Sequence, residues 1–370
     1  MTSLLEDTSR AMDRLHSLDF FRGLTMFLLV AESTHIYDRM VDPALGGTLL
    51  HAIGAQFEHH AWNGLHFWDL VQPFFMFIVG VALPFAVAKR ERKGDSRASI
   101  TRHAVKRAFV LLLLGWALYC IGPGRITFRF QNVLAQLSVT YLIAYLMMRK
   151  PAWSQIAVSL GLILSSELAY RFFWVPAYDQ AFVPDHNFGA WVDMLVSGEL
   201  SSGHWVSFNA IPTTAHTIWG VLAGQCLMAS WPHRKKLATL ASAGACAVVL
   251  GFALTPLTPM IKRICTSSFV IASGGFCLLA LALCYWVIDV KRLRRWVWVI
   301  NLVGMNSLFI YLFTESGGTS WVLRLVKPFT MAWADLIGIL PAEFLTSLAA
   351  WAVLWAMCYW LYRRMIVISI

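Results

Sequence analysis

Charged side chains are scarce in this sequence. Asp, Glu, Lys and Arg make up 14% of the 370 residues, and only 20 residues are acidic. A soluble domain normally carries about 25% charged residues. Hydrophobic residues make up 58% of the chain, and the mean hydropathy is +0.61. This composition excludes an ordinary cytosolic enzyme, a disordered chain and a nucleic-acid-binding protein, and it predicts an integral membrane protein.

Cysteine pairs and a cleavage signal are also missing. The seven cysteines are scattered within or at the ends of apolar stretches, none of them in a CxxC motif. An odd number of scattered thiols is no disulfide framework, and buried free cysteines usually act as small apolar packing residues. Residues 1–16 are polar, and the apolar run after them lacks a small-residue cleavage site, so a signal peptide is not expected.

Long apolar runs predict the fold. A helix needs about 20 mostly apolar residues to cross the hydrocarbon core of a bilayer. Ten such runs are centred near residues 27, 78, 113, 140, 161, 219, 247, 277, 304 and 352. The expected fold class is all-α, a polytopic membrane bundle of about ten transmembrane helices that forms one domain over residues 1–370.

Basic residues gather on one side of these runs. The termini and the loops between alternate runs hold 22 of the 30 Lys and Arg residues. Because cytoplasmic loops carry the excess of Lys and Arg, both termini are expected in the cytoplasm. The net charge of +10 is then an orientation signal. The extracytoplasmic loops are expected at residues 35–68, 172–207 and 316–341, which are rich in His, Trp, Asp and Gly.

The first outer loop holds the best candidate for a catalytic base. It contains five of the eleven histidines, and a neutral imidazole takes up a proton near pH 7. His59 and His60 have the polar and aromatic surroundings expected of a base, and Asp69 begins the next span and could orient it. Glu32, near the outer end of the first span, is a second acid/base group, a partner of His35, or part of an acceptor site.

Other classes of function remain open for these side chains. Glu32, His59 and Asp69 could form the proton relay of a proton-coupled transporter of sugars or acyl compounds. His59 and His66 could share a helical face, but no second pair completes a set of metal ligands, so no metal is expected. A haem or metal redox protein is a third possibility. Histidines that only hydrogen-bond near lipid headgroups are a fourth.

Further polar residues flank the later spans. A buried Asn in lipid must find partners, so Asn306 is either structural or ligand-binding, and Glu315 ends the same span. Ser267 belongs to a run of hydroxyl residues, 266–268, that caps the eighth span or binds a polar group. Trp62 could stack on a sugar or an adenine ring.

Several motifs in order resemble those of a known family. They are RLHSLDFFRG at 14–23, HHAWNG at 59–64, DLVQPF at 69–74, KRICTSS at 262–268 and GMNS at 304–307. With these motifs the chain resembles, over nearly its whole length, the transmembrane acyltransferases related to heparan-α-glucosaminide N-acetyltransferase.

The resemblance implies a function. It implies transfer of an acetyl group from cytosolic acetyl-CoA to an amine or hydroxyl of a small amino-sugar acceptor, in a bacterial inner membrane. The family's catalytic histidine, three residues before the Trp of W-N-G, corresponds to His59, which would act as the base or carry the acetyl group. An asparagine that the family has late in the first span falls on Ser33. A homodimer is compatible with the resemblance.

These considerations define the expected site. The catalytic candidates are His59, Asp69 and Glu32. The candidates for substrate binding are Ser33, Trp62, Asn63, Ser267, Asn306 and Glu315. The candidates for the CoA phosphates, on the inner side, are Arg102, Lys106 and Arg107.

Overall fold

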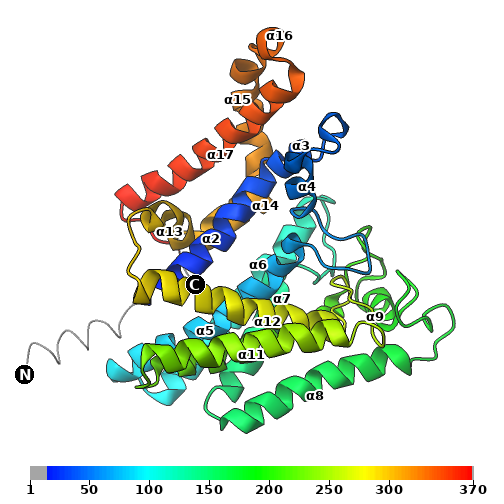
Figure 1. The fold of residues 1–370 in the computed structure, drawn as a ribbon. Coiled ribbons are helices and arrows are strands. Elements are labelled where there is room, and N and C mark those ends of the chain that lie inside the picture. Colours follow the sequence, from blue (N-terminus) through cyan, green and yellow to red (C-terminus); the bar gives the residue numbers. More distant parts are fainter. Residues whose placement is uncertain (1–14, 369–370) are drawn as a thin grey trace, which may run out of the picture. The chain divides into compact units, whose positions relative to one another are not determined.

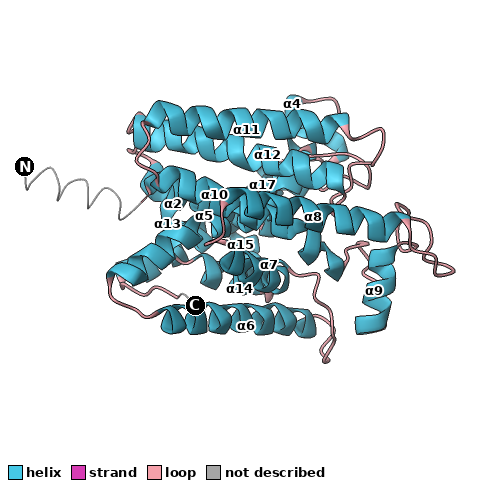
Figure 2. Ribbon diagram, turned by 90° about the horizontal axis from the view of Figure 1, so that it is seen from below, coloured by secondary structure: helices cyan, strands magenta, loops and turns pink. Residues whose placement is uncertain are grey.

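Helices make up all of the regular secondary structure in residues 15–368, the part of the chain that this computed structural model describes (Figures 1 and 2). The predicted all-α fold class is confirmed. Most of the expected N-terminal cytoplasmic segment, residues 1–14, lies outside the described residues.

Each of the ten predicted centres falls in or beside a helix. The helices are α2 (His16–Ser33), α5 (Val71–Arg92), α6 (Arg97–Ile121), α7 (Val133–Met147), α8 (Ala152–Arg171), α10 (Ala210–Met228), α11 (His233–Ala253), α12 (Ser267–Cys284), the pair α13 (Val297–Met305) and α14 (Ser307–Glu315), and α17 (Ile339–Arg363). Among the described helices, six are long and apolar enough to cross a membrane, and the pair α13 and α14, bent by 69°, makes a seventh if it counts as one span. The chain is therefore a multi-pass membrane protein, while the number of ten spans and the cytoplasmic termini stay predictions.

The expected outer loops contain short helices. These are α3 (Ile36–Met40), η1 (Pro43–Leu45), α4 (Leu49–Ala55), η2 (Phe67–Leu70), α9 (Phe188–Ser197), η3 (Ser207–Asn209), α15 (Gly318–Met331) and α16 (Ala334–Ile337), and a π-helical turn, η4 (Tyr285–Val290), extends α12. Local capping explains two of them. Thr48 accepts from the backbone N–H of His51 at the start of α4, and Asn187 accepts from Ala190 at the start of α9. Such side-chain caps satisfy backbone donors that a helix start leaves unpaired.

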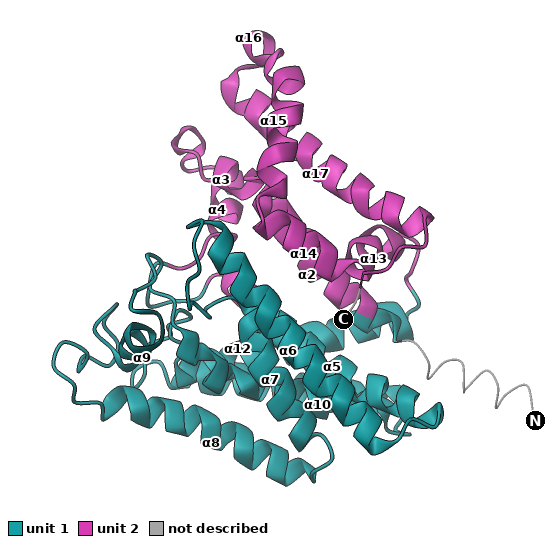
Figure 3. Cartoon of the chain, turned by 180° about the vertical axis from the view of Figure 1, so that it is seen from behind, with its two compact units in different colours: residues 1–18, 61–65, 72–292 teal, residues 19–60, 66–71, 293–370 magenta. Residues whose placement is uncertain are grey.

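The chain divides into two compact units (Figure 3). Unit 1 comprises residues 1–18, 61–65 and 72–292, and unit 2 comprises residues 19–60, 66–71 and 293–370. The chain thus passes from unit 2 into unit 1 after His60 and returns at His66. The assignment of residues 1–370 to a single domain stays a prediction.

Glycine contacts hold the helices of unit 1 together. A Cβ atom on Gly80 of α5 would collide with the carbonyl oxygen of Thr217 in α10, and one on Gly220 would collide with that of Phe77. The helices α11 and α12 lie side by side in both views of the ribbon (Figures 1 and 2). Without a hydrophobic driving force in lipid, helices associate through close contacts of this kind. Gly80 and Gly220 therefore allow α5 and α10 to approach closely.

Glycine residues also allow close helix contacts in unit 2. A Cβ on Gly23 of α2 would lie 2.6 Å from the carbonyl oxygen of Ile300 in α13, and one on Gly304 would lie 2.7 Å from the Cα of Gly23. Further out, α15 packs on α17, and the hydroxyls of Thr330 and Thr346 share a hydrogen bond of 2.6 Å. The contact of α2 with α13 fixes the helix that carries Glu32 and Ser33.

Candidate active site

Asp69 is the centre of a hydrogen-bonded group in unit 2. It lies in η2, directly before the long helix α5, and its side chain is 1% exposed. Its Oδ2 accepts from the backbone N–H of His66 at 2.9 Å and from that of His60 at 3.3 Å. Its Oδ1 lies 3.0 Å from Nδ1 of His59. These contacts tie the carboxylate to the backbone of the segment that carries the histidines.

The contact with Asp69 favours one tautomer of His59. An ionised carboxylate only accepts hydrogen bonds, so the proton of the neutral imidazole is placed on Nδ1 and the lone pair on Nε2. The side chain of His59 is 33% exposed, so its ring is within reach of water. A base that is oriented by a buried carboxylate and still accessible is the arrangement used for general-base catalysis.

His59 and His60 differ in how they meet Asp69. His59 presents its ring to the carboxylate, whereas His60 presents its backbone N–H. The ring of His60 packs edge-to-face on that of His66, with 4.9 Å between centroids. Its Nδ1 is buried and has no hydrogen-bond partner among the described residues. The geometry therefore supports His59 as the base, and that role stays a prediction.

Glu32 supports the segment that carries Asp69. Nε1 of the buried Trp68 donates to Oε1 of Glu32 at 2.8 Å. Tyr37 packs against Trp68 with 5.3 Å between ring centroids, and burial, together with the negative charge of Glu32, raises the pKa of Tyr37. The expected pairing of the Glu32 and His35 side chains is not found. The imidazole of His35 instead contacts Asp38, with 2.7 Å between Nδ1 and the carboxylate.

Ser33 and Asn306, two of the other predicted site residues of unit 2, form hydrogen bonds elsewhere in that unit. Ser33 Oγ donates to the carbonyl of Val30 at 2.8 Å and shares a hydrogen bond of 3.0 Å with Thr319. Asn306 sits at the bend between α13 and α14. Its Nδ2 donates to the carbonyl of Ile366 at 3.1 Å, and its Oδ1 accepts from the N–H of Ile368 at 3.0 Å. These contacts give Asn306 a structural role, and binding of substrate by Ser33, Asn306 or the exposed Glu315 stays a prediction.

Trp62 and Asn63 belong to unit 1. Nε1 of Trp62 donates to the carbonyl of Phe182 at 2.8 Å. Oδ1 of Asn63 accepts from the N–H of Met260 at 3.0 Å, and the N–H of Gly64 donates to the carbonyl of Met260 at 2.8 Å. The short segment that follows the histidines is thus anchored to unit 1, and binding of substrate by Trp62 and Asn63 stays a prediction.

The basic candidates for CoA lie in the first half of α6. Arg102 and Lys106 are exposed and four residues apart, so they share one face of the helix. Arg107 is half-buried, and its guanidinium lies 5.0 Å from the centroid of the Tyr141 ring. Each of these cations is in unit 1, and their role in CoA binding stays a prediction.

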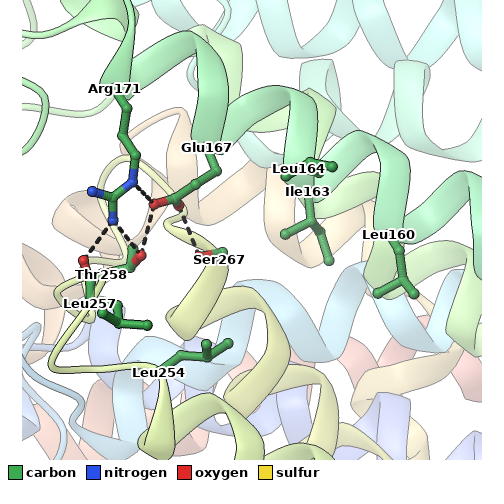
Figure 4. A pocket seen from close by; sticks show the side chains of 9 residues that line it. All are labelled: Leu160, Ile163, Leu164, Glu167, Arg171, Leu254, Leu257, Thr258 and Ser267. Atoms are coloured by element: carbon green, nitrogen blue, oxygen red, sulfur yellow. Dashed lines mark hydrogen bonds and ion pairs between the residues drawn. The ribbon is translucent and has the colours of Figure 1, made fainter.

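Ser267, the first residue of α12, lines a pocket of unit 1 with a volume of about 420 Å³ (Figure 4). Its Oγ donates to Oε2 of Glu167 at 2.9 Å. Oε1 of Glu167 accepts from Thr258 Oγ1 at 2.7 Å and from Arg171 Nε at 2.6 Å. The hydroxyl of Ser267 is therefore engaged in a polar network, and its predicted role in substrate binding stays open.

Sequence reasoning missed this network, as well as a second histidine–carboxylate pair. Glu167 and Arg171 are four residues apart in an apolar run, a signal that could have marked them. His204 Nδ1 lies 2.7 Å from Asp185 Oδ2, and both residues have a φ near +60°, which no sequence pattern indicates. Across the described residues, no group of three or more His, Cys, Asp or Glu side chains could hold a metal ion.

The protein has several helices that can cross a membrane, and a buried carboxylate contacts a histidine ring. It is therefore a multi-pass membrane protein with a candidate acid–base site. Residues 14–125 match a family model described as a domain of unknown function, DUF5009. The chain is 25% identical to mouse heparan-alpha-glucosaminide N-acetyltransferase over 89% of its own length and 57% of the mouse protein. It is 31% identical to the human protein of that name over 35% of its own length and 18% of the human protein.

These comparisons confirm the resemblance that the motifs carry. The chain is related to a transmembrane acyltransferase family that includes heparan-alpha-glucosaminide N-acetyltransferase. It spans about half of the mouse relative's length and a smaller part of the human one. The activity of the whole relatives is therefore brought to this chain as a proposal.

Proposed function

We propose that the protein is a membrane-embedded acetyltransferase. It moves an acetyl group from cytosolic acetyl-CoA to an amine or hydroxyl of an amino sugar of the glucosamine or N-acetylglucosamine type, on or near the extracytoplasmic side. The observation that carries the proposal is the contact of His59 with the buried Asp69. The reaction class and the acceptor class follow the printed names of the mouse and human relatives.

His59 acts as the base in this mechanism. Its Nε2 takes the proton of the acceptor's amine or hydroxyl while that group attacks the thioester carbonyl carbon. When the carbon–sulfur bond breaks, the imidazolium returns the proton to the departing thiolate of CoA. Asp69 holds the Nδ1–H throughout and stabilises the positive charge that forms on the ring.

A covalent route uses the same residue. Nε2 of His59 then attacks the thioester carbonyl carbon, the carbon–sulfur bond breaks, and CoA leaves as its thiolate. The acceptor next attacks the acetyl carbon, the carbon–nitrogen bond to Nε2 breaks, and the acceptor's proton passes to Nε2 or to water, which gives ping-pong kinetics. In both routes Asp69 fixes the ring, and Glu32 acts through Trp68 on the segment that places Asp69. Initial-rate kinetics with both substrates varied separate the two routes, because parallel double-reciprocal lines are expected only for the covalent one.

The exposed cations of α6 are proposed to bind the phosphates of CoA. The positive charges of Arg102 and Lys106 attract the negative charge of a phosphate. Substitution of both residues by Gln is expected to raise KM for acetyl-CoA by about tenfold, or about 1.4 kcal/mol, with little change in kcat. The same substitution should have a smaller effect with an acyl thioester that lacks the nucleotide, such as an acyl-pantetheine.

The test of the function uses the purified protein in detergent with acetyl-CoA and a panel of glucosamine, N-acetylglucosamine and simple amines. Release of free CoA and formation of acetylated product are measured for the wild type and for His59→Ala. His35→Ala is a matched control, since His35 pairs with an exposed Asp38. The proposal expects activity to fall in His59→Ala alone. If acetyl-CoA neither binds nor releases CoA with any acceptor, the proposal fails and a proton-coupled transporter becomes the better hypothesis.

We also propose that the protein lies in the inner membrane of a bacterium and that it can form a homodimer. The mass of the purified particle, after correction for bound detergent, tests the dimer.

A further inference from the structure

The guanidinium of Arg171 has hydrogen-bond donors in excess of its partners. Nε donates to Glu167, and Nη2 donates to the carbonyl of Leu257 at 2.6 Å and to Thr258 Oγ1 at 2.9 Å. Nη1 has no hydrogen-bond partner within the described part of the chain. The side chain is 36% exposed, its guanidinium carbon lies 5.1 Å from the centroid of the Phe182 ring, and Figure 4 shows the guanidinium at the polar end of the pocket lining.

The remaining polar groups of the pocket are already hydrogen-bonded to one another, which disfavours a cation or a sugar as the ligand. Both oxygens of Glu167 accept hydrogen bonds, from Arg171, Thr258 and Ser267. The charge of the carboxylate is already paired with that of Arg171, so a cation finds no unpaired acceptor there. A sugar would need several donors and acceptors, whereas the hydroxyls of Thr258 and Ser267 are already committed to the carboxylate.

The rest of the pocket wall is apolar. Five of its nine lining residues are aliphatic: Leu160, Ile163, Leu164, Leu254 and Leu257. Figure 4 shows those of α8 following one another along the helix, away from the end that carries Arg171. Leu160 and Leu164 are 49% and 58% exposed, and they lie on a helix that is long and apolar enough to cross a membrane. An alkyl chain is the ligand that such a wall favours.

We propose that this pocket binds one phospholipid molecule. Its phosphate accepts hydrogen bonds from Nη1 of Arg171, and one of its acyl chains lies against Leu160 and Leu164. Because Nε and Nη2 are engaged, the two N–H groups of Nη1 are the ones that donate to the phosphate, and the permanent positive charge of the guanidinium strengthens these hydrogen bonds. Arg171 is the last residue of α8, which places the phosphate at the end of the span, where headgroups lie. Glu167 is the positioning residue that holds the guanidinium in place.

Native mass spectrometry of the full chain released from detergent tests the proposal. The probes are phosphatidylglycerol and monogalactosyl diacylglycerol with the same acyl chains, which differ in the phosphate. The wild type is expected to retain one phosphatidylglycerol with an affinity at least about tenfold above that for the galactolipid. Equal retention of the two lipids would overturn the assignment of the phosphate to this pocket.

Two variants separate the headgroup contact from the chain contact. Arg171→Lys keeps the charge but loses the Nη1 donors and the contacts that hold the guanidinium in place, and it is expected to weaken phosphatidylglycerol binding about fivefold or more. Leu164→Trp fills part of the pocket at a residue whose side chain makes no hydrogen bond, and it is expected to abolish retention. Ile156→Trp is the matched control, since Ile156 is also exposed on α8 but does not line the pocket. Retention by Leu164→Trp equal to that of the control would refute the site.

Discussion

Nδ1 of His59 lies 3.0 Å from Oδ1 of Asp69, a carboxylate that is 1% exposed. The residues are ten positions apart, and the segment between them leaves unit 2 and returns to it. Asp69 also accepts hydrogen bonds from the backbone N–H groups of His60 and His66. One carboxylate therefore binds the residues on both sides of the segment 61–65. The pair therefore orients a histidine ring and closes a loop.

Asp69→Asn tests the orientation of the histidine. Asn can donate where Asp only accepts, so it favours the tautomer of His59 that carries its proton on Nε2, the atom needed as base. By analogy with other histidine–carboxylate pairs, kcat for acetyl transfer is expected to fall by a factor on the order of 10² to 10⁴. The thermal unfolding midpoint serves as the control for folding. An unchanged kcat would contradict the role of Asp69.

Glu32 is expected to act through Trp68. Glu32→Ala leaves the indole N–H of the buried Trp68 without its acceptor, which should lower the free energy of unfolding by about 1–3 kcal/mol. Glu32→Gln keeps an acceptor oxygen and should cost less, with activity within a few-fold of wild type. Chemical denaturation and the transfer assay measure both effects. Loss of activity in the Gln variant at unchanged stability would instead identify Glu32 as an acid/base group.

Gly220 is expected to be intolerant of a side chain. An added methyl group would collide with the carbonyl oxygen of Phe77, so Gly220→Ala should lower the free energy of unfolding by about 1–3 kcal/mol. Gly161→Ala is the matched control, because nothing lies within 4 Å of its added Cβ. There the substitution should stabilise by about 0.5–1 kcal/mol. Equal stability of the two variants would refute the close contact of α5 with α10.

Cys265 is expected to be unreactive at neutral pH. Burial raises the pKa of its thiol to about 12, and its side chain is 1% exposed. Only the thiolate is a nucleophile, so alkylation at pH 8 should be at least about 10³-fold slower than for a free cysteine and should speed up as pH rises. A variant that keeps Cys265 as its only cysteine, treated with maleimide before and after unfolding in SDS, measures this. Rapid labelling of the folded protein would contradict the burial.

The sequence predicts the features that depend on local pattern. Apolar runs locate the helices, because the length needed to cross a bilayer is fixed. The proximity of His59 and Asp69 is also predictable, since both lie in one loop before a helix. The network of Glu167 is not, because Thr258 and Ser267 reach it from about 90 and 100 positions away.

The break at Asn306 shows the same limit. Its polar side chain interrupts an apolar run, and that much is visible in the sequence. Its partners, the backbone groups of Ile366 and Ile368, come from a segment about 60 residues further on. Such long-range pairing depends on how the helices pack, and no periodicity within one segment encodes it.

Chemical rescue of the histidine variants identifies the catalytic histidine. Acetyl transfer is measured for His59→Ala and His60→Ala with and without added imidazole. We expect that His59→Ala loses activity and that imidazole restores part of it, while His60→Ala keeps most of its activity and does not respond. Loss and rescue in His60→Ala, with His59→Ala still active, would contradict the assignment of His59 as the catalytic histidine.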